Sequence, residues 1–402
     1  MTDHMRPRDE AEVAEAVRWA LAQGRTLEVA GTGSKRGLGR TIQTDAALDL
    51  SALSGVTLYE PDELVLSAGA GTPLGEIAAL VAGAGQMLAF EPADFGQLLG
   101  EPAGGGTLGG LLACNLAGPR RPSAGAARDH ALGLRAVSGR GELFKAGGRV
   151  VKNVTGYDLP RGLAGSHGTL AAFTEITLKV LPRPETAETL LLLGLDDAAA
   201  AQAMSRAMGA DCDVSGAAHL PAAIAGLVPA VAAAGAAVTA LRLEGVPPSI
   251  AHRRRRLEAL LSNEGTLGAL GAEASAALWQ AVRDVLPFAG ATRPVWRVST
   301  APLQGPAIGI AAARIGARCF YDWAGGLVWI ECPGDEPQAE AVRAAVRAAG
   351  GHATLMRASP AQRAALDVFE PLEAAAAALT RRVKESFDPH RVLNPGRMYA
   401  GV

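Results

Sequence analysis

Two glycine-rich stretches decide the fold of this chain: AGTGSKRGLGR (Ala30–Arg40) and GGGTLGGLLACNLAG (Gly104–Gly118). Glycine lacks a Cβ, so the backbone N–H groups of such loops can approach a ligand closely and the chain can adopt positive φ angles. A single loop of this kind is often an ordinary tight turn. Two of them predict a long ligand with a charged centre, such as a dinucleotide, that is held from both sides.

The first loop is not predicted to belong to a Rossmann fold. It follows a short apolar strand, Thr26–Ala30, as a Rossmann loop would. However, a Rossmann loop opens directly into a helix whose N-terminus holds the pyrophosphate. The polar residues RTIQTD (Arg40–Asp45) that follow here show no apolar period of 3.6 residues. A P-loop is also excluded, because Lys35 lacks the glycine spacing of that motif.

Composition predicts a globular protein with more than one domain. The chain has 402 residues, of which 49% are hydrophobic and 19% charged, and its net charge is −2. This charge gives no general electrostatic reason to bind nucleic acid. The uncharged stretch Val214–Ala240 is rich in Ala and Gly and contains Pro221 and Pro229. We expect it to be a buried helical segment and not a membrane span.

The four cysteines are far apart and form no C-x-x-C pair. This spacing excludes an in-chain iron–sulfur cubane of the usual kind and argues against a disulfide framework, and it suits a reducing cytosol. The first residues, Met1–Val17, lack the apolar core of a signal peptide. We therefore expect a cytoplasmic protein that does not insert directly into a membrane, and we predict no metal site.

Hydrophobic periodicity and turn signals predict a coarse order of helices and strands. Glu10–Ala22 places Val13 and Val17 on one face and is expected to form an amphipathic helix. A second helix is expected to begin at Thr72-Pro73, with the threonine as its cap, and to run to about Gly83. Strands are expected at Ala47–Leu50, Val56–Tyr59, Leu64–Ala68, Leu132–Val137, Leu143–Lys145, Val295–Val298 and Leu327–Ile330.

The main domain boundary is predicted after a strand that contains Phe173 and ends at the prolines 182 and 184. Its apolar and polar residues alternate, which predicts that one face of the strand is exposed. The composition then shifts to alanine-rich helices and short strands. We therefore expect a first domain in residues 1–184, a second in residues 185–380 and a C-terminal segment in residues 381–402.

Taken in order, the motifs resemble the vanillyl-alcohol-oxidase or PCMH-type family of FAD-binding proteins. The resemblance is carried by the first glycine loop, LDLSAL, LVLSAGAGTPLGEI, TLGGLLACNLAG, RDHALGL, KNVTGYDL, GSHGTLAAFTEITLKVLP and the tail FDPHRVLNPGRM (Phe387–Met398). It covers nearly all of residues 1–184 and the end of the chain. KNVTGYDL, RPVWRVS and DWAGGLVWIE are closer still to the FAD-binding E subunits of bacterial glycolate oxidase.

The resemblance implies an α+β, PCMH-type two-subdomain FAD-binding fold with a smaller α/β cap domain, and residues 381–402 returning to the FAD domain. It implies that the first loop and Thr107 grip the FAD pyrophosphate and ribityl chain from two sides. It also places Cys114–Ala117 along the isoalloxazine edge and Phe173 near the adenine, which it meets through its backbone. The implied FAD-contacting residues are Gly31, Thr32, Gly33, Ser34, Lys35, Arg36, Thr107, Gly109, Gly110, Cys114, Asn115, Leu116, Ala117 and Phe173.

Some positions depart from the family pattern. The first loop lacks the histidine, and the second lacks a suitably placed cysteine, with which relatives hold flavin covalently, so non-covalent FAD is expected. His167 stands where relatives have Glu or an apolar residue, and a surface or backbone-bonded histidine is favoured over a flavin-tuning one. GGHATLMRAS (residues 350–359) has one histidine, so a site built from paired histidines is not predicted. The resemblance identifies no catalytic residue.

Arginines are the candidates for pairing with the carboxylate of a small 2-hydroxy acid. Arg293 and Arg297 could do this, although an ion pair within the cap domain is the favoured interpretation for both. The run Arg253–Arg256 is expected to form a solvated helix face that an acidic patch of a partner could use.

Three functions stay open. The first is an FAD-binding subunit of a glycolate oxidase (glycolate dehydrogenase) complex, which oxidises glycolate to glyoxylate and works with a catalytic FAD subunit and an iron–sulfur subunit that takes the electrons. Such partners could hold it at the periphery of the inner membrane. The second is a stand-alone FAD-dependent alcohol or 2-hydroxy-acid dehydrogenase. The third is a structural subunit that has lost its flavin.

Overall fold

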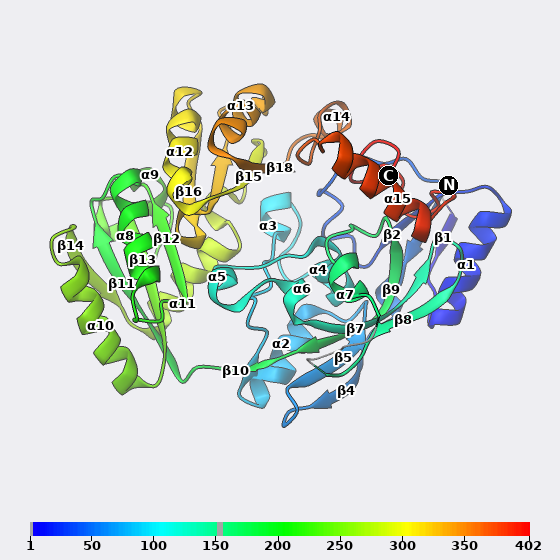
Figure 1. Ribbon diagram of the computed structural model, residues 1–402, viewed down its shortest axis with the longest axis horizontal. Helices are drawn as coiled ribbons and strands as arrows, with labels where there is room; N and C mark the ends of the chain where they lie inside the picture. Colours follow the sequence, from blue (N-terminus) through cyan, green and yellow to red (C-terminus); the bar gives the residue numbers. More distant parts are fainter. Residues whose placement is uncertain (1–2, 151–155) are drawn as a thin grey trace.

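The computed structural model describes residues 3–150 and 156–402, and these residues form an α+β protein with three main sheets (Figure 1). Residues 152–155 of the KNVTGYDL motif lie outside the described residues. The helix predicted at Glu10–Ala22 is confirmed, as are the predicted strands, with ends that differ by a few residues.

The first sheet positions the first glycine loop. Its strands are parallel in the order β1 (Asp3–Met5), β3 (Ala46–Asp49), β2 (Leu27–Ala30). Helix α1 (Glu10–Ala22) packs its apolar face, including Val13 and Val17, against this sheet. The loop leaves directly from the carboxyl end of β2, so the strand fixes where its backbone N–H groups lie.

The second glycine stretch lies beside the second sheet, which we call the central sheet. Its antiparallel order is β4 (Val56–Glu60), β5 (Val65–Gly69), β9 (Ala171–Lys179), β7 (Ala131–Ser138), β8 (Leu143–Gly147). The prediction that β9 exposes one face is wrong. β9 is the middle strand, and even its threonines are buried: Thr177 hydrogen-bonds Ser67 at 2.7 Å between the two hydroxyl oxygens. The hydroxyl of Thr177 is thus paired inside the sheet, whereas Thr174 Oγ1 is buried without a hydrogen-bond partner in the described chain.

The third sheet, which we call the cap sheet, is antiparallel throughout. Its order is β14 (Thr266–Leu270), β11 (Thr186–Leu193), β13 (Val238–Gly245), β12 (Gly216–Leu220), β16 (Arg318–Asp322), β17 (Leu327–Glu331), β15 (Val295–Thr300), β18 (Gly351–Arg357). The helical segment expected at Val214–Ala240 is wrong in the main. This stretch contributes β12 and the start of β13, and only Ala222–Ala225 and the turn Ala232–Ala234 between them are helical.

The cap sheet is covered differently on its two faces. The helices α8 (Asp197–Gly209), α10 (Pro247–Leu261), α12 (Gly305–Arg314) and α13 (Ala339–Ala349) pack on one face. Helix α11 (Ala272–Arg283) and the central-sheet region pack on the other, within one continuous core. The rings of Phe95 and Trp329 meet edge to face across this junction at 5.5 Å between centroids. The domain limits at residues 184 and 380 stay predictions.

Helix α2 (Leu74–Gly83) is confirmed, but Thr72 does not cap it. The hydroxyl of Thr72 donates to Gly69 O at 2.7 Å, and Pro73 occupies the capping position without a side-chain hydrogen bond.

Among the described helices, none is both long and apolar enough to cross a membrane. The shorter helices and the remaining two strands are α3 (Gly96–Leu99), α4 (Leu108–Cys114), α5 (Arg121–Ala124), α6 (Ala127–His130), α7 (Leu159–Leu163), α9 (Ala222–Ala225), α14 (Pro360–Ala365), β6 (Gln86–Met87) and β10 (Leu181–Pro182).

The end of the chain returns to the first sheet. Helix α15 (Ala374–Phe387), red in Figure 1, lies beside the N-terminal strands, and Leu393 forms a parallel bridge with Leu27. The ammonium of Lys384 donates to Thr169 O at 2.6 Å and to the buried carboxylate of Asp388 at 2.8 Å. These contacts hold the C-terminal segment against the strand that bears the first loop.

Candidate functional site

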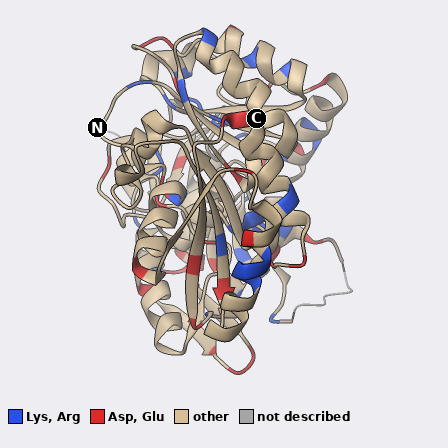
Figure 2. Ribbon diagram, turned by 90° about the vertical axis from the view of Figure 1, so that its left-hand side faces the viewer, with Lys and Arg blue, Asp and Glu red and all other residues tan. Residues whose placement is uncertain are grey.

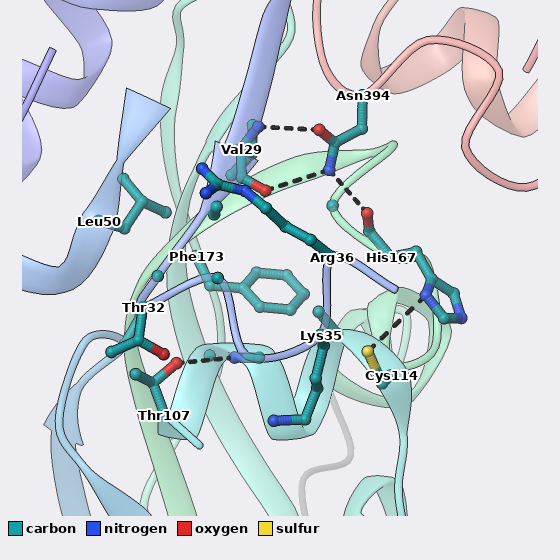
Figure 3. Close-up of a pocket in the computed structure, with 18 of the residues that line it drawn as sticks. Val29, Thr32, Lys35, Arg36, Leu50, Thr107, Cys114, His167, Phe173 and Asn394 are labelled. Atoms are coloured by element: carbon teal, nitrogen blue, oxygen red, sulfur yellow. Dashed lines mark hydrogen bonds between the residues drawn. The ribbon is translucent and has the colours of Figure 1, made fainter. Parts of the chain in front are cut away.

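A cleft that is open to solvent at its mouth joins the two glycine stretches. Figure 3 shows its side chains converging from the first sheet, α4, the central sheet and the C-terminal segment. The lining residues are Val29, Ala30, Gly31, Thr32, Gly33, Ser34, Lys35, Arg36, Leu50, Ala70, Thr107, Gly109, Gly110, Ala113, Cys114, His167, Gly168, Ala171, Phe173, Asn394 and Arg397.

Most of the residues predicted from the sequence line this cleft. They are Gly31, Thr32, Gly33, Ser34, Lys35, Arg36, Thr107, Gly109, Gly110, Cys114 and Phe173. Asn115, Leu116 and Ala117 are not brought to its wall. Asn115 ends α4 with φ 48° and accepts a hydrogen bond from Arg128 N at 3.1 Å, while Leu116 is buried in the core.

The first loop presents unpaired backbone donors. Within the described chain, the N–H groups of residues 32–35 donate no hydrogen bond to protein atoms. The hydroxyl of Thr32 donates to Gly105 O, which ties the two glycine stretches together. A Cβ at Gly31 would lie 2.9 Å from Thr107 Oγ1, so only glycine lets the loops approach this closely. A row of free N–H groups between two glycine loops suits phosphate oxygens.

Helix α4 closes the other side of the cleft. Thr107 caps it by accepting from Gly110 N at 3.3 Å. A Cβ at Gly109 would lie 2.9 Å from Ala70 Cβ, so this glycine lets α4 pack directly on the chain that follows β5. In contrast, a Cβ at Gly110 would meet only Thr107 Oγ1 at 3.3 Å and Lys35 Nζ at 3.8 Å, so Gly110 opens toward the cleft.

The cleft carries surplus positive charge. Arg36 pairs with Glu28 at 3.0 Å, but Lys35 and Arg397 form no ion pair with any residue in the described ranges. Burial lowers the pKa of the Arg397 guanidinium, an effect that Glu28 and Cys114 partly offset. Cations in this setting favour an anionic ligand, because the anion replaces the water that burial has removed.

Asn394 is a site residue that the sequence prediction did not assign. Its side chain accepts from Val29 N at 2.8 Å and donates to Val29 O at 3.3 Å and to His167 O at 2.8 Å (Figure 3). It therefore joins the strand before the first loop to the turn before β9. Asn394 and Arg397 lie within the C-terminal motif FDPHRVLNPGRM. The family resemblance includes this motif but assigns none of its residues to the cofactor site.

His167 lines the cleft, so the surface interpretation is wrong. Its main-chain N–H donates to Ala113 O at 2.8 Å. Its Nδ1 lies 3.7 Å from Cys114 Sγ. Burial, with the nearby Arg397 charge, lowers the pKa of His167 to about 4, so the imidazole is neutral at pH 7. Burial also raises the pKa of the Cys114 thiol, which is therefore protonated.

Phe173 contributes its ring to the cleft and not only its backbone. The ring lies between the first loop and β9 in Figure 3, with 3% of the residue exposed. It offers an apolar surface to a ligand. Its predicted position next to adenine stays a prediction.

The cap arginines divide into paired and unpaired groups. Arg293 lies 3.5 Å from Glu331, as the ion-pair interpretation predicts, whereas Arg297 has no acidic partner in the described chain.

Figure 2 looks onto the cap side and shows blue residues gathered on one helix with red residues beside them. In the run 253–256, Arg253 donates to Glu244 O, Arg254 pairs with Glu188 and Glu258, and Arg256 pairs with Asp211. The surplus charge expected of this run is therefore largely neutralised.

Comparisons with known proteins identify the family. Residues 4–147 match the model of an FAD binding domain, and residues 369–398 match the C-terminal domain of FAD linked oxidases. The chain is 35% identical to glycolate oxidase subunit GlcE of Escherichia coli (strain K12) over 388 residues, or 96% of each chain. It is 43% identical to glycolate oxidase subunit GlcD of Bacillus subtilis (strain 168) over 99 residues, or 25% of this chain and 21% of GlcD.

Solved structures confirm the expected fold. 4-Ethylphenol oxidase from Gulosibacter chungangensis matches with a TM-score of 0.71 and 13% identity, over 99% of this chain and 89% of that chain. p-Cresol methylhydroxylase matches with a TM-score of 0.70 and 13% identity, over 98% and 88%. The α+β, PCMH-type prediction is thus correct.

The cofactor of this family fits the cleft. Free N–H groups at residues 32–35, the unpaired charges of Lys35 and Arg397, and the open side of Gly110 suit the anionic centre of FAD. The similarity to GlcE spans nearly the whole of both proteins. The chain therefore belongs to the GlcE family of FAD-linked oxidases and is an FAD-dependent oxidoreductase.

Proposed function

We propose that this chain is the FAD-binding subunit of a glycolate oxidase complex and takes part in oxidising the CH–OH group of glycolate to glyoxylate. The observation that carries the proposal is the cleft that both glycine stretches form with Asn394 and Arg397, in a chain that is similar to GlcE over 96% of its length. D-lactate dehydrogenase of Archaeoglobus fulgidus, which is 31% identical over 44% of this chain, supports a 2-hydroxy acid as the substrate class.

The residues of the cleft have distinct roles in holding FAD. The N–H groups of residues 32–35, with Lys35 and Arg397, bind the pyrophosphate. Gly110 leaves space for the ribityl chain, and Phe173 packs against an aromatic part of the cofactor. Bound FAD supplies the acceptor for the hydride of the substrate. The binding is non-covalent, because the first loop has no histidine and Cys114 does not stand at the position with which relatives hold flavin covalently.

The complex supplies the route by which electrons leave. The similar GlcE and GlcD proteins are both named as subunits of glycolate oxidase, which supports a multi-subunit assembly. The family resemblance adds a catalytic FAD subunit and an iron–sulfur subunit as the partners. The iron–sulfur subunit accepts the electrons of the reduced flavin.

The test is co-expression of the chain, affinity-tagged, with the neighbouring genes of its source, followed by absorbance spectroscopy and acid precipitation. The expected result is a yellow protein that releases about one FAD per chain into the acid supernatant, and a co-purified partner whose iron–sulfur absorbance bleaches with glycolate. Flavin retained on the precipitated protein would contradict non-covalent binding. A colourless chain that does not take up added FAD would contradict the flavin subunit itself.

A further inference from the structure

Two arginines from different parts of the fold lie around one tryptophan at the junction between the cap sheet and the FAD-binding region. The guanidinium carbon of Arg121, at the start of α5, lies 4.5 Å from the centroid of the Trp323 ring. The guanidinium carbon of Arg297, on β15, lies 4.9 Å from the centroid of the same ring. Trp323 itself is 7% exposed.

Neither arginine has an acidic partner. Within residues 3–150 and 156–402, no carboxylate pairs with Arg121 or Arg297, whereas Arg120, Arg242 and Arg293 are all in ion pairs. Burial, together with the Arg121 charge, lowers the pKa of Arg297 to about 10, although Asp322 acts in the opposite direction. Two half-buried like charges that repel each other are destabilising unless an anion compensates them.

The strand register places Arg297 on the face of the cap sheet that meets the FAD-binding region. Its neighbours Trp296 and Val298 belong to the core on the opposite face, under α12 and α13. Arg297 is paired across the sheet with Trp329, which packs against the central-sheet region. Alternation of side chains along a strand then directs Arg297 toward that region.

The second glycine stretch ends at the same place. Trp323 Nε1 donates to Gly118 O at 3.0 Å, and Gly118 is the last residue of the stretch that contributes Cys114 to the cleft. His352 lies on β18, where it is paired with Ser299 two positions beyond Arg297. Burial, followed by the charge of Arg297, lowers the pKa of His352, so its imidazole is neutral at pH 7 and can accept a hydrogen bond.

We propose that Arg121 and Arg297 form a binding site for the carboxylate of a small 2-hydroxy acid, with Trp323 as its apolar wall. This inference rests on the proposed function and assigns the substrate to residues of this chain. A guanidinium is suited to the task because its planar donors match a carboxylate. The half-buried setting strengthens each charge-assisted hydrogen bond relative to water. His352 then lies on the same face to accept from the hydroxyl beside the carboxylate.

The test uses the FAD-loaded chain and oxalate, a small carboxylate that the enzyme cannot oxidise as a CH–OH donor. Binding is measured by calorimetry and by the change in tryptophan fluorescence, with sodium chloride at the same ionic strength as the reference. The variants are Arg121→Gln and Arg297→Gln. The matched control is Arg314→Gln, an exposed arginine at the end of α12 that pairs with no carboxylate among the described residues. FAD content and Tm are measured for each.

We expect saturable oxalate binding that weakens at least about tenfold in either variant and is unchanged in the control, at unchanged FAD content. In the absence of oxalate, Arg297→Gln should keep or raise Tm, because it removes an uncompensated charge. A fall in Tm without a change in oxalate affinity would mean that the pair is structural and would overturn the proposal. Equal effects of chloride and oxalate would also overturn it.

The proposal and the proposed function fail in different ways. If oxalate needs both arginines but glycolate is not oxidised by the complex, the carboxylate site stands and the glycolate assignment is wrong. If glycolate reduces the complex with the same concentration dependence in Arg297→Gln, Arg121→Gln and the unmodified protein, the arginine site is wrong and the proposed function stands.

Discussion

His167 has a left-handed backbone, with φ 52°, and its imidazole faces the cofactor cleft. Its pKa is lowered to about 4 by burial and by Arg397, while the unfolded chain has the ordinary value near 6.5. Between about pH 6.5 and pH 4, His167 therefore binds a proton in the unfolded chain but not in the folded one. The stability of the fold should fall as the pH decreases from about 6.5 to about 4.

The variant His167→Asn isolates this effect, because asparagine tolerates a positive φ and does not titrate. Between pH 7.5 and 4.5, the unmodified protein should lose about 2–3 kcal/mol more unfolding free energy than the variant. Urea denaturation at the two pH values measures the difference. Parallel losses in the two proteins would show that His167 is protonated in the fold.

Gly110 opens toward the cleft, so a side chain at this position should displace the cofactor without unfolding the protein. We expect Gly110→Leu to lose FAD, because the nearest protein atoms leave room for the Cβ but the rest of the side chain enters the cleft. The measurement is the ratio of flavin to protein absorbance, with circular dichroism as the check on folding. Gly83→Leu, in open space at the end of α2, is the matched control. A yellow Gly110→Leu protein would contradict this placement of FAD.

Local patterns predicted the loop residues of the site and missed those supplied by distant segments. The two glycine stretches predicted a long ligand held from both sides, and the family resemblance then assigned Gly31 and Gly110 to FAD. Asn394 acts through hydrogen bonds to Val29 and His167, which lie 365 and 227 residues away in the chain. No periodicity or spacing within a single sequence encodes such contacts, so only the family resemblance pointed to this segment.

At the scale of elements, α15 is held at its C-terminal end, where Lys384 is buried and Phe387 packs against the core. The ammonium of Lys384 contacts the carboxylate of Asp388, which in turn accepts from Val392 N and Leu393 N, and both charged residues are almost fully buried. Most other residues of α15 are exposed. The position of the C-terminal segment therefore depends on this pair.

Replacing Lys384 by Met should lower the unfolding free energy by about 3–5 kcal/mol, because the Asp388 charge is then buried without its partner. Arg382→Met, on the exposed side of the same helix, should change stability by less than about 0.5 kcal/mol. Chemical denaturation measures both. The Lys384→Met variant should also bind FAD more weakly, because Lys384 contacts Leu393 O, next to the cleft residue Asn394. Equal stabilities of the two variants would contradict a structural role for the pair.

The elements themselves were predictable where one local rule applied, and the errors have tertiary causes. The helix Glu10–Ala22 follows from its apolar period and its Asp9 cap. Thr72 has the residue type of a cap, but its hydroxyl donates its hydrogen bond to Gly69 O instead. The stretch 214–240 is rich in alanine, a helix former, yet burial between two layers favours strands there.

Across the whole molecule, the FAD-binding region and the cap sheet are joined by a partly buried network of charges. Arg242 on β13 donates to Glu91 at 2.8 Å, and Arg120 pairs with both Glu91 and Glu244. Arg120 and Arg242 lower the pKa of Glu244 to about 2 against the opposing effect of burial, so this carboxylate stays charged in the fold.

Glu91→Gln should lower the unfolding free energy by about 3–5 kcal/mol, because it leaves two arginines at the junction with one carboxylate. It should also separate the unfolding of the two regions, so that flavin loss and the loss of helical signal no longer coincide in urea. Glu340→Gln, on the exposed start of α13, is the control. Coincident transitions with unchanged stability would contradict a coupling role for Glu91.

The tail that supplies Asn394 and Arg397 also sets when the protein can acquire its cofactor during biosynthesis. The ribosome makes both glycine stretches early, but the strand before the first loop receives its asparagine partner only after 365 further residues have been added to the chain. A nascent chain that lacks this tail has its loops without the residues that fix them. A chain interrupted before residue 394 should therefore hold FAD less firmly than one that includes Asn394 and Arg397.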